Sequence, residues 1–288
     1  IKVATKSKKN IYVTVQIDSW NCQERIPIGH IDLELGLVGV DSGEKKFLLA
    51  KNQLLRPSWK KIISKNPEIL NIKTPTTQEE TNRLNLTHLP IFSIDPEGSR
   101  DLDDALHCKY VSSCGREDGY WLVGIHIADV TACYKWNSKL DLMARSRTTS
   151  LYLDQVDPLL PEYLSNDKAS LIEQEPRWSV SVLVTINQNG DTILNTKLKR
   201  SLINVVKNYT YQQVDQGQVS ESVRDQIKQL WKFRNIFGAK NNEEINEKMI
   251  DDEKLDSHQL VEMMMIWTNR WIASRFLEKG KGFYRVGS

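Results

Sequence analysis

The sequence predicts an α+β protein in which a small β-barrel precedes a larger, mixed α/β domain. Three observations support this fold class. Short β-branched segments punctuated by glycine occupy the first 50 residues. A buried-strand pattern at 120–130 and a hairpin pattern at 180–198 follow them. Helical patterns come next, at 222–237 and 259–278.

The first domain is predicted to cover residues 1–70. Residues 11–17 alternate between β-branched and polar side chains, as in a half-buried strand. Segments 31–40 and 46–50 are further strand candidates, and the apolar spacing over 59–70 predicts a short helix. The glycines that mark bends between the strands are Gly36, Gly39 and Gly43. Short strands with such bends favour a small barrel.

A polar stretch separates the two domains. Residues 71–85 are expected to form a linker, and residues 86–288 the second domain. Within that domain, 180–186 and 192–198 are predicted to pair as a hairpin. Asn189-Gly190 between them is typical of a primed turn.

Composition restricts the class of protein. The chain is 26% charged and 40% hydrophobic, which argues against wholesale disorder. No apolar run approaches the ~18 residues of a membrane span. Residues 1–86 hold 14 Lys and Arg against 9 Asp and Glu, a net +5, and the remainder holds 25 against 28, a net −3. A mildly basic front with an acidic cluster behind it suits a substrate that is a phosphate polymer.

The four cysteines are Cys22, Cys108, Cys114 and Cys133. They form no CxxC pair, so neither a zinc site nor a secreted disulfide framework is indicated. We expect reduced thiols in an intracellular protein of the cytoplasm or nucleus, with an organelle as a further option.

The segment from Ile94 to Leu106 carries the clearest chemistry. It places four carboxylates within ten residues, namely Asp95, Asp101, Asp103 and Asp104. Carboxylates held this close repel one another unless some are protonated or a cation lies among them. Mg²⁺ is commonly held by a few carboxylates together with substrate phosphates. The cluster therefore predicts a metal site that acts on a phosphate ester.

The cluster has two other interpretations. A calcium loop needs glycine at its sixth position and glutamate at its twelfth, and these positions hold Arg100 and Leu106. A solvated acidic loop is the usual fate of a charge run, but apolar residues flank this one on both sides. A turn over 96–99 would bring Asp95 back towards the other three carboxylates.

Several blocks, in order, resemble the RNase II superfamily, and most closely the eukaryotic branch that supplies the exoribonuclease of the RNA exosome. The blocks are Leu89-Pro90 with Ser93 to Pro96, Asp101 to Cys108, Gly124 to Val130, Arg147 to Leu153, Leu160 to Glu162, and Leu260 to Met265 with Asn269. Two positions depart from the family pattern. Thr148 stands where glycine is usual, and Met263 replaces a second glutamate.

The resemblance refines the expected fold. Ile17 to Trp20 and Pro27 to His30 resemble the second cold-shock-type OB domain of the family, which binds single strands on aromatic platforms. Residues 86–288 resemble the N-terminal part of the RNB-type catalytic domain. The chain is accordingly expected to be truncated at both ends and incomplete at the C-terminal side of that domain.

The resemblance also implies roles for the acidic residues. Asp95 and Asp104 are expected to ligate Mg²⁺, with Mn²⁺ as an alternative, and Asp101 to belong to the same metal site. Asp103 is the residue whose loss should stop the reaction. The metals would activate a water and stabilise charge on the scissile phosphate.

Four more residues are implied in RNA binding. Tyr152 resembles the aromatic residue that stacks on a base, although a core tyrosine is the alternative. Tyr211 and Glu262 resemble positions that contact the sugar and distinguish RNA from DNA, and Glu262 alternatively favours its helix N-terminus. Arg147 is a candidate phosphate contact. His126 is expected to be a hydrogen-bonded core residue.

Two functions follow from these expectations. The first is a processive Mg²⁺-dependent 3′→5′ exoribonuclease that hydrolyses single-stranded RNA to nucleoside 5′-monophosphates. The exosome core or other RNA-decay proteins would be its partners, with no membrane involved. The second is a non-catalytic RNA-binding or scaffold subunit on the same fold. Retention of all four aspartates favours the first, because an unused carboxylate cluster costs stability.

Overall fold

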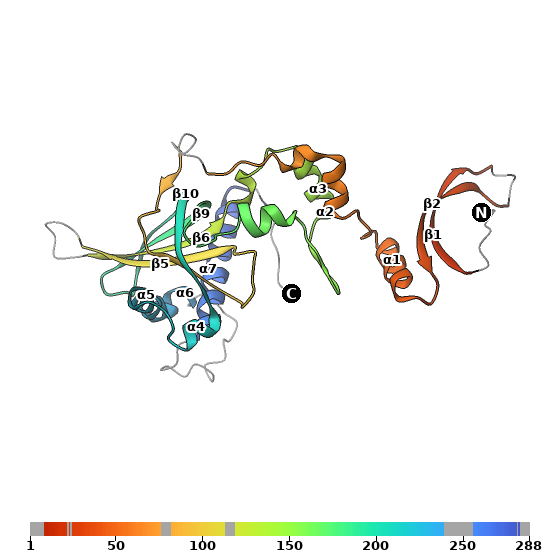
Figure 1. The fold of residues 1–288 in the computed structure, drawn as a ribbon. Coiled ribbons are helices and arrows are strands. Elements are labelled where there is room, and N and C mark those ends of the chain that lie inside the picture. The colour runs from red at the N-terminus through yellow and green to blue at the C-terminus, as the bar shows by residue number, and fades with distance from the viewer. Residues whose placement is uncertain are drawn as a thin grey trace. The chain divides into compact units, whose positions relative to one another are not determined.

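The chain folds into two compact units (Figure 1). A computed structural model describes residues 9–21, 23, 25–75, 82–112, 119–238, 256–280 and 282. Residues Ile1–Glu68 and Leu142–Leu159 make up the first unit, and Ile69–Asp141 and Leu160–Ser288 the second. The return of 142–159 to the first unit is not anticipated by the sequence pattern. Two of the expected thiols, Cys108 and Cys133, are free and buried, and the other two cysteines lie outside the described residues.

The first unit is built on an antiparallel pair of strands. β1 (Ile11–Ser19) pairs with β2 (Ile28–Leu37), so the strand predicted at 31–40 begins and ends three residues earlier. The strand predicted at 46–50 is wrong, because these residues lie in the helix α1 (Asp41–Lys51). The described residues therefore contribute two strands and a helix of the expected barrel.

Packing on β1 explains why 46–50 is helical. The rings of Tyr12 and Phe47 stack with centroids 4.3 Å apart, and the Tyr12 hydroxyl donates to Glu44 at 3.1 Å. Glu44 and Phe47 lie three residues apart, so only a helix presents both to the same tyrosine. Gly43 allows this approach, because a Cβ there would lie 2.2 Å from the Leu37 carbonyl oxygen.

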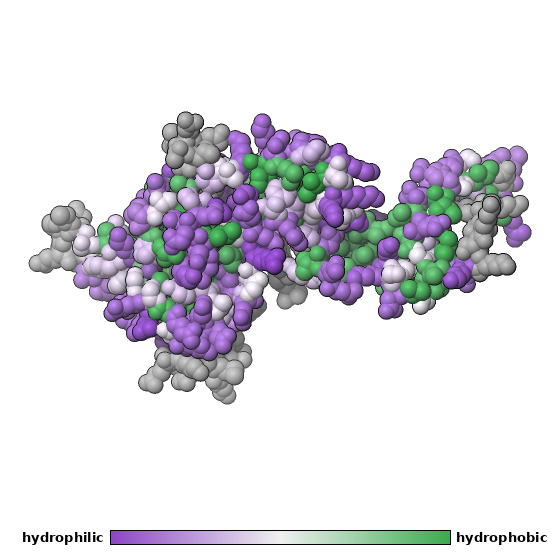
Figure 2. All heavy atoms as spheres, in the orientation of Figure 1, coloured by the Kyte–Doolittle hydropathy of each residue, from purple (hydrophilic) through white to green (hydrophobic). Residues whose placement is uncertain are grey.

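The rest of the first unit is short elements. The helix expected over 59–70 is α2 (Trp59–Lys65), followed by a 3₁₀ turn over Pro67–Leu70. β7 (Leu151–Tyr152) and β8 (Val156–Asp157) form a small hairpin. Hydrophobic residues remain at the surface of this unit (Figure 2), including Ile17, Trp20, Ile28 and Leu48, each more than half exposed.

A six-stranded sheet forms the centre of the second unit, in the order β3-β10-β4-β5-β6-β9. Its strands are β3 (Leu84–Asn85), β4 (Ile91–Asp95), β5 (Asp104–Val111), β6 (Tyr120–Ala128), β9 (Pro176–Asn187) and β10 (Ile193–Thr210). β10 is long enough to pair with β9 over its first two thirds, from Ile193 to Asn204, and with β4 over its last residues. Pairing at both ends of β10 closes five of these strands into a ring.

The predicted β9–β10 hairpin is confirmed, but its turn is different. Gly190 alone in the connection has a positive φ, of 78°, whereas a type I′ turn needs two such residues. Instead, the side-chain oxygen of Asn187 accepts from the backbone N–H groups of Gly190, Asp191 and Thr192, at 3.1–3.2 Å. Asn187 thus organises a longer loop than the dipeptide pattern predicts.

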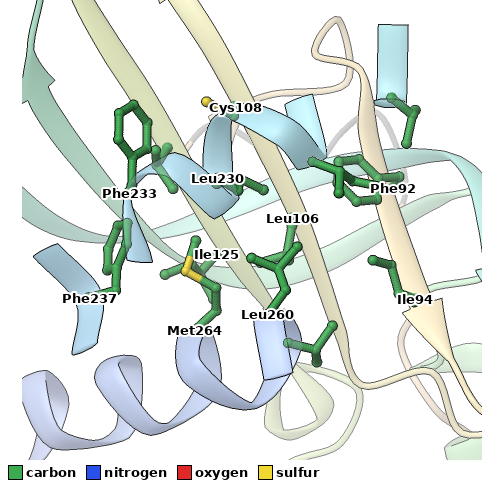
Figure 3. Packing of buried hydrophobic residues seen from close by; sticks show 14 of the residues in the cluster. Phe92, Ile94, Leu106, Cys108, Ile125, Leu230, Phe233, Phe237, Leu260 and Met264 are labelled. Carbon is green, nitrogen blue, oxygen red and sulfur yellow. The ribbon is translucent and has the colours of Figure 1, made fainter. Parts of the chain in front are cut away.

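Helices cover one face of the sheet. α4 (Tyr211–Asp215) follows β10 directly, and α5 (Glu221–Lys232), α6 (Arg234–Gly238) and α7 (Ser257–Glu278) follow it. The helix predicted at 222–237 is interrupted at Phe233, and the one at 259–278 is confirmed as α7. Side chains from α5, α6 and α7 meet those of the sheet in the main core, as Leu230, Phe237 and Leu260 show against Ile125 (Figure 3). Two further helical segments lie in the connections between strands. They are α3 (Lys139–Arg147), most of which belongs to the first unit, and a π-type turn at Leu164–Lys168.

The opposite face of the sheet buries a polar network. His107 and His126 stack with centroids 5.0 Å apart and share a hydrogen bond of 2.8 Å, and His126 also bonds Ser181 at 2.6 Å. Gly124 of β6 pairs with His107 of β5, and a Cβ at Gly124 would lie 2.1 Å from the His107 ring. The expectation of a hydrogen-bonded core His126 is confirmed. No helix in the described part of the chain is long and apolar enough to cross a membrane.

Candidate active site

The acidic cluster lies where β4 ends and β5 begins. Asp95 is the last residue of β4 and Asp104 the first of β5. The predicted turn between them is present: the Ser99 N–H donates to the Pro96 carbonyl at 3.1 Å, with Gly98 at a φ of 78°. A chain reversal next to adjacent strands returns the later carboxylates to Asp95.

The segment carrying Asp101 and Asp103 has no regular structure but is fixed at several backbone atoms. Ser170 accepts from the Leu102 N–H at 3.0 Å and donates to the Arg100 carbonyl at 2.9 Å. The Ala128 N–H donates to the Asp103 carbonyl at 2.8 Å. These three bonds come from segments remote in sequence, so the loop is held by tertiary contacts.

Electrostatic coupling shows that the four carboxylates form one group. Burial raises the pKa of Asp95, opposed by a hydrogen bond from Ser93 and assisted by Asp103 and Asp101. Burial and the nearby Asp101 raise the pKa of Asp103. Burial, with Asp95 and Asp103, raises the pKa of Asp104 to about 7. The charged forms of these carboxylates are therefore disfavoured, which is typical of carboxylates that bind a cation.

A chain of hydrogen bonds orients Asp95. Ser93 donates to Asp95 Oδ2 at 2.7 Å, and Asn208 on β10 donates to Ser93 at 2.8 Å. Asn208 is itself fixed by Glu173, whose N–H donates to Asn208 Oδ1 at 2.8 Å and whose carboxylate accepts from the Asn208 N–H at 3.0 Å. One carboxylate oxygen of Asp95 is thus committed to Ser93. The sequence pattern does not identify Asn208, which is 115 residues from Ser93.

The donor chemistry of the cluster fits a hard divalent cation. All of its side-chain donors are carboxylate oxygens, which Mg²⁺ and Mn²⁺ prefer. Among the described residues, however, no three His, Cys, Asp or Glu side chains are arranged as a ready-made cage for a metal. Mg²⁺ usually relies on one or two carboxylates and completes its shell with waters and substrate phosphates. The cluster fits that kind of shared site.

Tyr211 lies beside the acidic cluster. It immediately follows β10, where Thr210 pairs in register with Asp95. Burial raises the pKa of Tyr211, and the charges of Asp104 and Asp95 add to the increase. The tyrosine ring stacks face to face on His258 of α7, with centroids 3.6 Å apart and an interplanar angle of 14°. The structure thus brings Tyr211 to the cluster and adds His258, which sequence reasoning missed.

Glu262 is exposed on α7, one turn beyond His258. Residues four apart are neighbours on one face of a helix. Glu262 and the His258–Tyr211 stack therefore occupy one side of the second unit. The alternative role for Glu262, favouring the helix N-terminus, weakens because it sits in the second turn of α7.

The expected phosphate contact at Arg147 is not supported by its surroundings. Arg147 is 3% exposed, in the first unit. Its guanidinium donates to Asp157 at 2.8 Å and to the Pro158 carbonyl at 3.0 Å, and it lies 4.5 Å from the centroid of the Trp59 ring. Arg56 donates to the same Asp157 at 2.6 Å. Arg147 instead joins segments of the first unit that are 90 residues apart, a contact that a linear motif does not reveal.

Tyr152 is 79% exposed in β7 of the first unit. Tyr152 is therefore not a core residue of this unit, and the alternative of a buried tyrosine is wrong. An exposed ring is what a stacking platform requires.

Comparison with known families assigns both parts of the chain. The family described as "RNB domain" matches residues 83–287, and "Dis3-like cold-shock domain 2" matches residues 1–53. The first match alone covers well over half of the chain. The second supports the OB-type assignment of the strands β1 and β2.

Curated relatives agree with these matches. The human "Exosome complex exonuclease RRP44" is 33% identical over 235 residues, covering 78% of this chain and 23% of that protein. A probable RRP44 from Caenorhabditis elegans is 27% identical and covers 93% of this chain and 30% of the relative. Ribonuclease R from Buchnera aphidicola is 30% identical, and the match covers 80% of this chain and 34% of that protein. The chain thus spans a third or less of the length of most of these relatives.

Solved structures show the same fold. Mycoplasma genitalium RNase R in complex with ribose-methylated single-stranded RNA matches with a TM-score of 0.65 at 24% identity, over 82% of this chain and 37% of that one. Yeast Ssd1, described as a pseudonuclease, matches with a TM-score of 0.57 at 23% identity, over 78% of this chain and 28% of that one. The order of motifs, the fold and the family match agree: the chain belongs to the RNB-domain family, within the RNase II superfamily.

Proposed function

We propose that the protein is a processive 3′→5′ exoribonuclease that hydrolyses single-stranded RNA to nucleoside 5′-monophosphates with Mg²⁺, or alternatively Mn²⁺. The observation that carries this proposal is the convergence of the four aspartates where β4 ends and β5 begins, together with the raised pKa values of Asp95, Asp103 and Asp104. Family membership adds support, because relatives are named as exonucleases and ribonucleases.

Three of the aspartates would form the metal site, and the fourth would be needed for hydrolysis. Asp95 and Asp104, at the ends of adjacent strands, would hold the metal, with Asp101 completing the site. When bound, the metal supplies an activated water and stabilises charge on the scissile phosphate. Asp103 would be the residue on which hydrolysis depends. Ser93 and Asn208 keep the Asp95 carboxylate in one orientation, so its position does not have to be organised during the reaction.

Substrate recognition would use exposed rings and polar side chains. Tyr152 would stack on a base, which is tolerant of sequence and suits a non-specific exonuclease. Tyr211 and Glu262 would contact the sugar near the cut and prefer the 2′-hydroxyl of RNA. Residues 1–70 would act as an OB-type RNA-binding domain, joined through the predicted linker 71–85 to the catalytic domain, 86–288. The last two residues of that linker, Leu84–Asn85, already form β3 of the second unit. We propose the exosome core or another RNA-decay assembly as the partner, and the cytoplasm or nucleus as the place of action.

The alternative is a non-catalytic RNA-binding or scaffold subunit. The fold match to a pseudonuclease and the departures at Thr148 and Met263 favour it. Retention of the whole acidic cluster opposes it, because neighbouring carboxylates repel one another and an unused cluster costs stability.

Product analysis tests the proposal. The full-length protein should shorten 5′-labelled single-stranded RNA from its 3′ end with Mg²⁺, release nucleoside 5′-monophosphates, and stop in EDTA. The label should pass from intact RNA to a short end product without intermediates, since a processive enzyme does not release them. Internal fragments, or activity that survives EDTA, would contradict the proposal, and RNA binding without cleavage would support the alternative.

Replacing Tyr152 by alanine should lengthen the final undegraded RNA rather than stop degradation. Loss of one stacked base weakens the hold on short RNA by ~1–3 kcal/mol, while longer RNA retains its other contacts. End products are mapped on a sequencing gel. Gln155→Ala is the matched control, because Gln155 is an exposed neighbour with no ring. An unchanged product length in Tyr152→Ala would argue against a platform.

A further inference from the structure

Tyr211 has a fixed backbone beside the acidic cluster. Thr210 and Gln213 form a capping box, in which the Thr210 side chain accepts from the Gln213 N–H and the Gln213 side chain from the Thr210 N–H, at 3.2 and 2.9 Å. The Ser257 hydroxyl donates to the Tyr211 carbonyl at 3.4 Å. These contacts hold the main chain but leave rotation of the tyrosine side chain undetermined.

His258 supplies the missing constraint on the ring. The two rings are nearly parallel, and their centroid separation of 3.6 Å is that of direct face-to-face contact. The hydroxyl of Tyr211 makes no hydrogen bond within the described part of the chain, whereas its ring is held by this stack. A held ring with an uncommitted hydroxyl is suited to contact a bound molecule.

The start of α7 holds His258 in turn. Asp256 caps the helix by accepting from the Gln259 N–H at 3.1 Å, and the Ser257 N–H donates to Asp215 of α4 at 3.2 Å. Ser257 is fully buried. The first turn of α7 is therefore hydrogen-bonded to the same short helix that begins with Tyr211, so the two backbone segments that carry the rings are joined.

One face of α7 links the two proposed sugar-contacting residues. His258 stacks on Tyr211, and Glu262 follows four residues later on the same helix face. We infer that His258 is a positioning residue that fixes the Tyr211 ring and thereby the sugar selectivity of the site. This inference rests on the proposed function of Tyr211 and Glu262, and it assigns His258 no contact with the substrate.

Substitutions at His258 separate this role from a structural one. His258→Ala removes the stack. It should lower the selectivity for RNA, measured as kcat/KM for RNA divided by kcat/KM for DNA, by about 3- to 10-fold. His258→Phe retains an aromatic ring and should restore the ratio to within about 2-fold of wild type. Gln259→Ala, an exposed neighbour on the same turn, is the control that should leave it unchanged.

The measurement uses the full-length protein with matched RNA and DNA oligomers, and thermal unfolding confirms that the variants are folded. Fluorescence anisotropy with the same oligomers in EDTA gives a binding ratio that does not need hydrolysis. A selective loss for RNA in His258→Ala, restored by phenylalanine, supports the inference. An unchanged ratio, an equal loss on both oligomers, or failure of phenylalanine to restore selectivity would overturn it. A wild type that binds RNA without cleaving it would overturn the proposed hydrolase, and the binding ratio would still decide on His258.

Discussion

Asp103→Asn should abolish hydrolysis of single-stranded RNA while leaving RNA affinity within about 3-fold of wild type. The substitution keeps the shape of the side chain but removes a charge from a cluster whose members are electrostatically coupled. Loss of at least about 1,000-fold in rate is expected, because charge stabilisation in the transition state is the largest contribution to such catalysis. Affinity rests on backbone and stacking contacts along the strand, which the substitution does not touch.

The rate is measured with full-length protein, labelled RNA and Mg²⁺, and the affinity by anisotropy in EDTA. Glu97→Gln is the matched control, since Glu97 is an exposed carboxylate in the turn between Asp95 and Asp104. It should retain a wild-type rate. An Asp103→Asn protein that degrades RNA at the wild-type rate would show that the catalytic role has been assigned to the wrong residue.

The buried histidine pair should make folding stability depend strongly on pH between 7 and 5. Burial lowers the pKa of His107 to about 4, assisted by the charges of His88 and Lys109. Burial also lowers the pKa of His126 well below its usual value, assisted by His107. The carboxylates of the acidic cluster lie on the same sheet and also titrate. Their effect on the free energy of unfolding must therefore be separated from that of the histidines.

The direction follows from the bound protons. A histidine in the unfolded chain takes up a proton near pH 6.5, whereas the folded pair stays neutral. The stability that the neutral pair contributes is complete above pH 6.5 and is lost as the pH falls towards 4. His107 alone should cost roughly 2 kcal/mol by pH 5, and His126 adds a loss in the same direction. Asp104, whose folded pKa of about 7 lies above its unfolded value, opposes this change.

A comparison of wild type with a variant that lacks both histidines cancels the effect of the carboxylates. The free energy of unfolding is measured in EDTA at pH 7 and pH 5 for wild type and for His107→Asn combined with His126→Gln. Asp104 is common to both proteins, so the wild type should lose roughly 2 kcal/mol or more relative to the variant. If the variant does not fold, NMR titration of the wild-type histidine rings decides. Two rings that titrate near pH 6.5 would refute the neutral pair.

Local pattern was sufficient for most of the elements, and the failures have a common cause. Alternation in 11–17 and the apolar spacing of 259–278 predicted β1 and α7. α7 buries Leu260, Val261 and Met264, whereas β1 has no buried residue, so its β-branched composition alone was enough to predict it. Residues 46–50 were predicted as a strand and form part of α1, since the deciding contact is with Tyr12, more than 30 residues away. The primed turn failed because Asn187, outside the dipeptide, organises the loop.

The candidate site divides along the same line. The acidic residues, Tyr211 and Glu262 could be proposed from the sequence, because motif residues lie close together in the chain or keep their order. Asn208 and His258 were missed, because their partners Ser93 and Tyr211 are 115 and 47 positions away. The expected phosphate contact of Arg147 failed, because a sequence motif does not show whether the guanidinium is exposed to solvent or bonded to Asp157.

The sequence by itself determined the identities and spacing of the four aspartates, the position of β1, of the β9–β10 hairpin and of α7, and the resemblance to the family. Those features depend on local composition and on the order of motifs along the chain. The tertiary structure decided which side chains meet. β10 brings Asn208 to Ser93 and Tyr211 to the acidic cluster, and α7 brings His258 to Tyr211. Such contacts form only when β10 pairs with β4, so no local pattern encodes them.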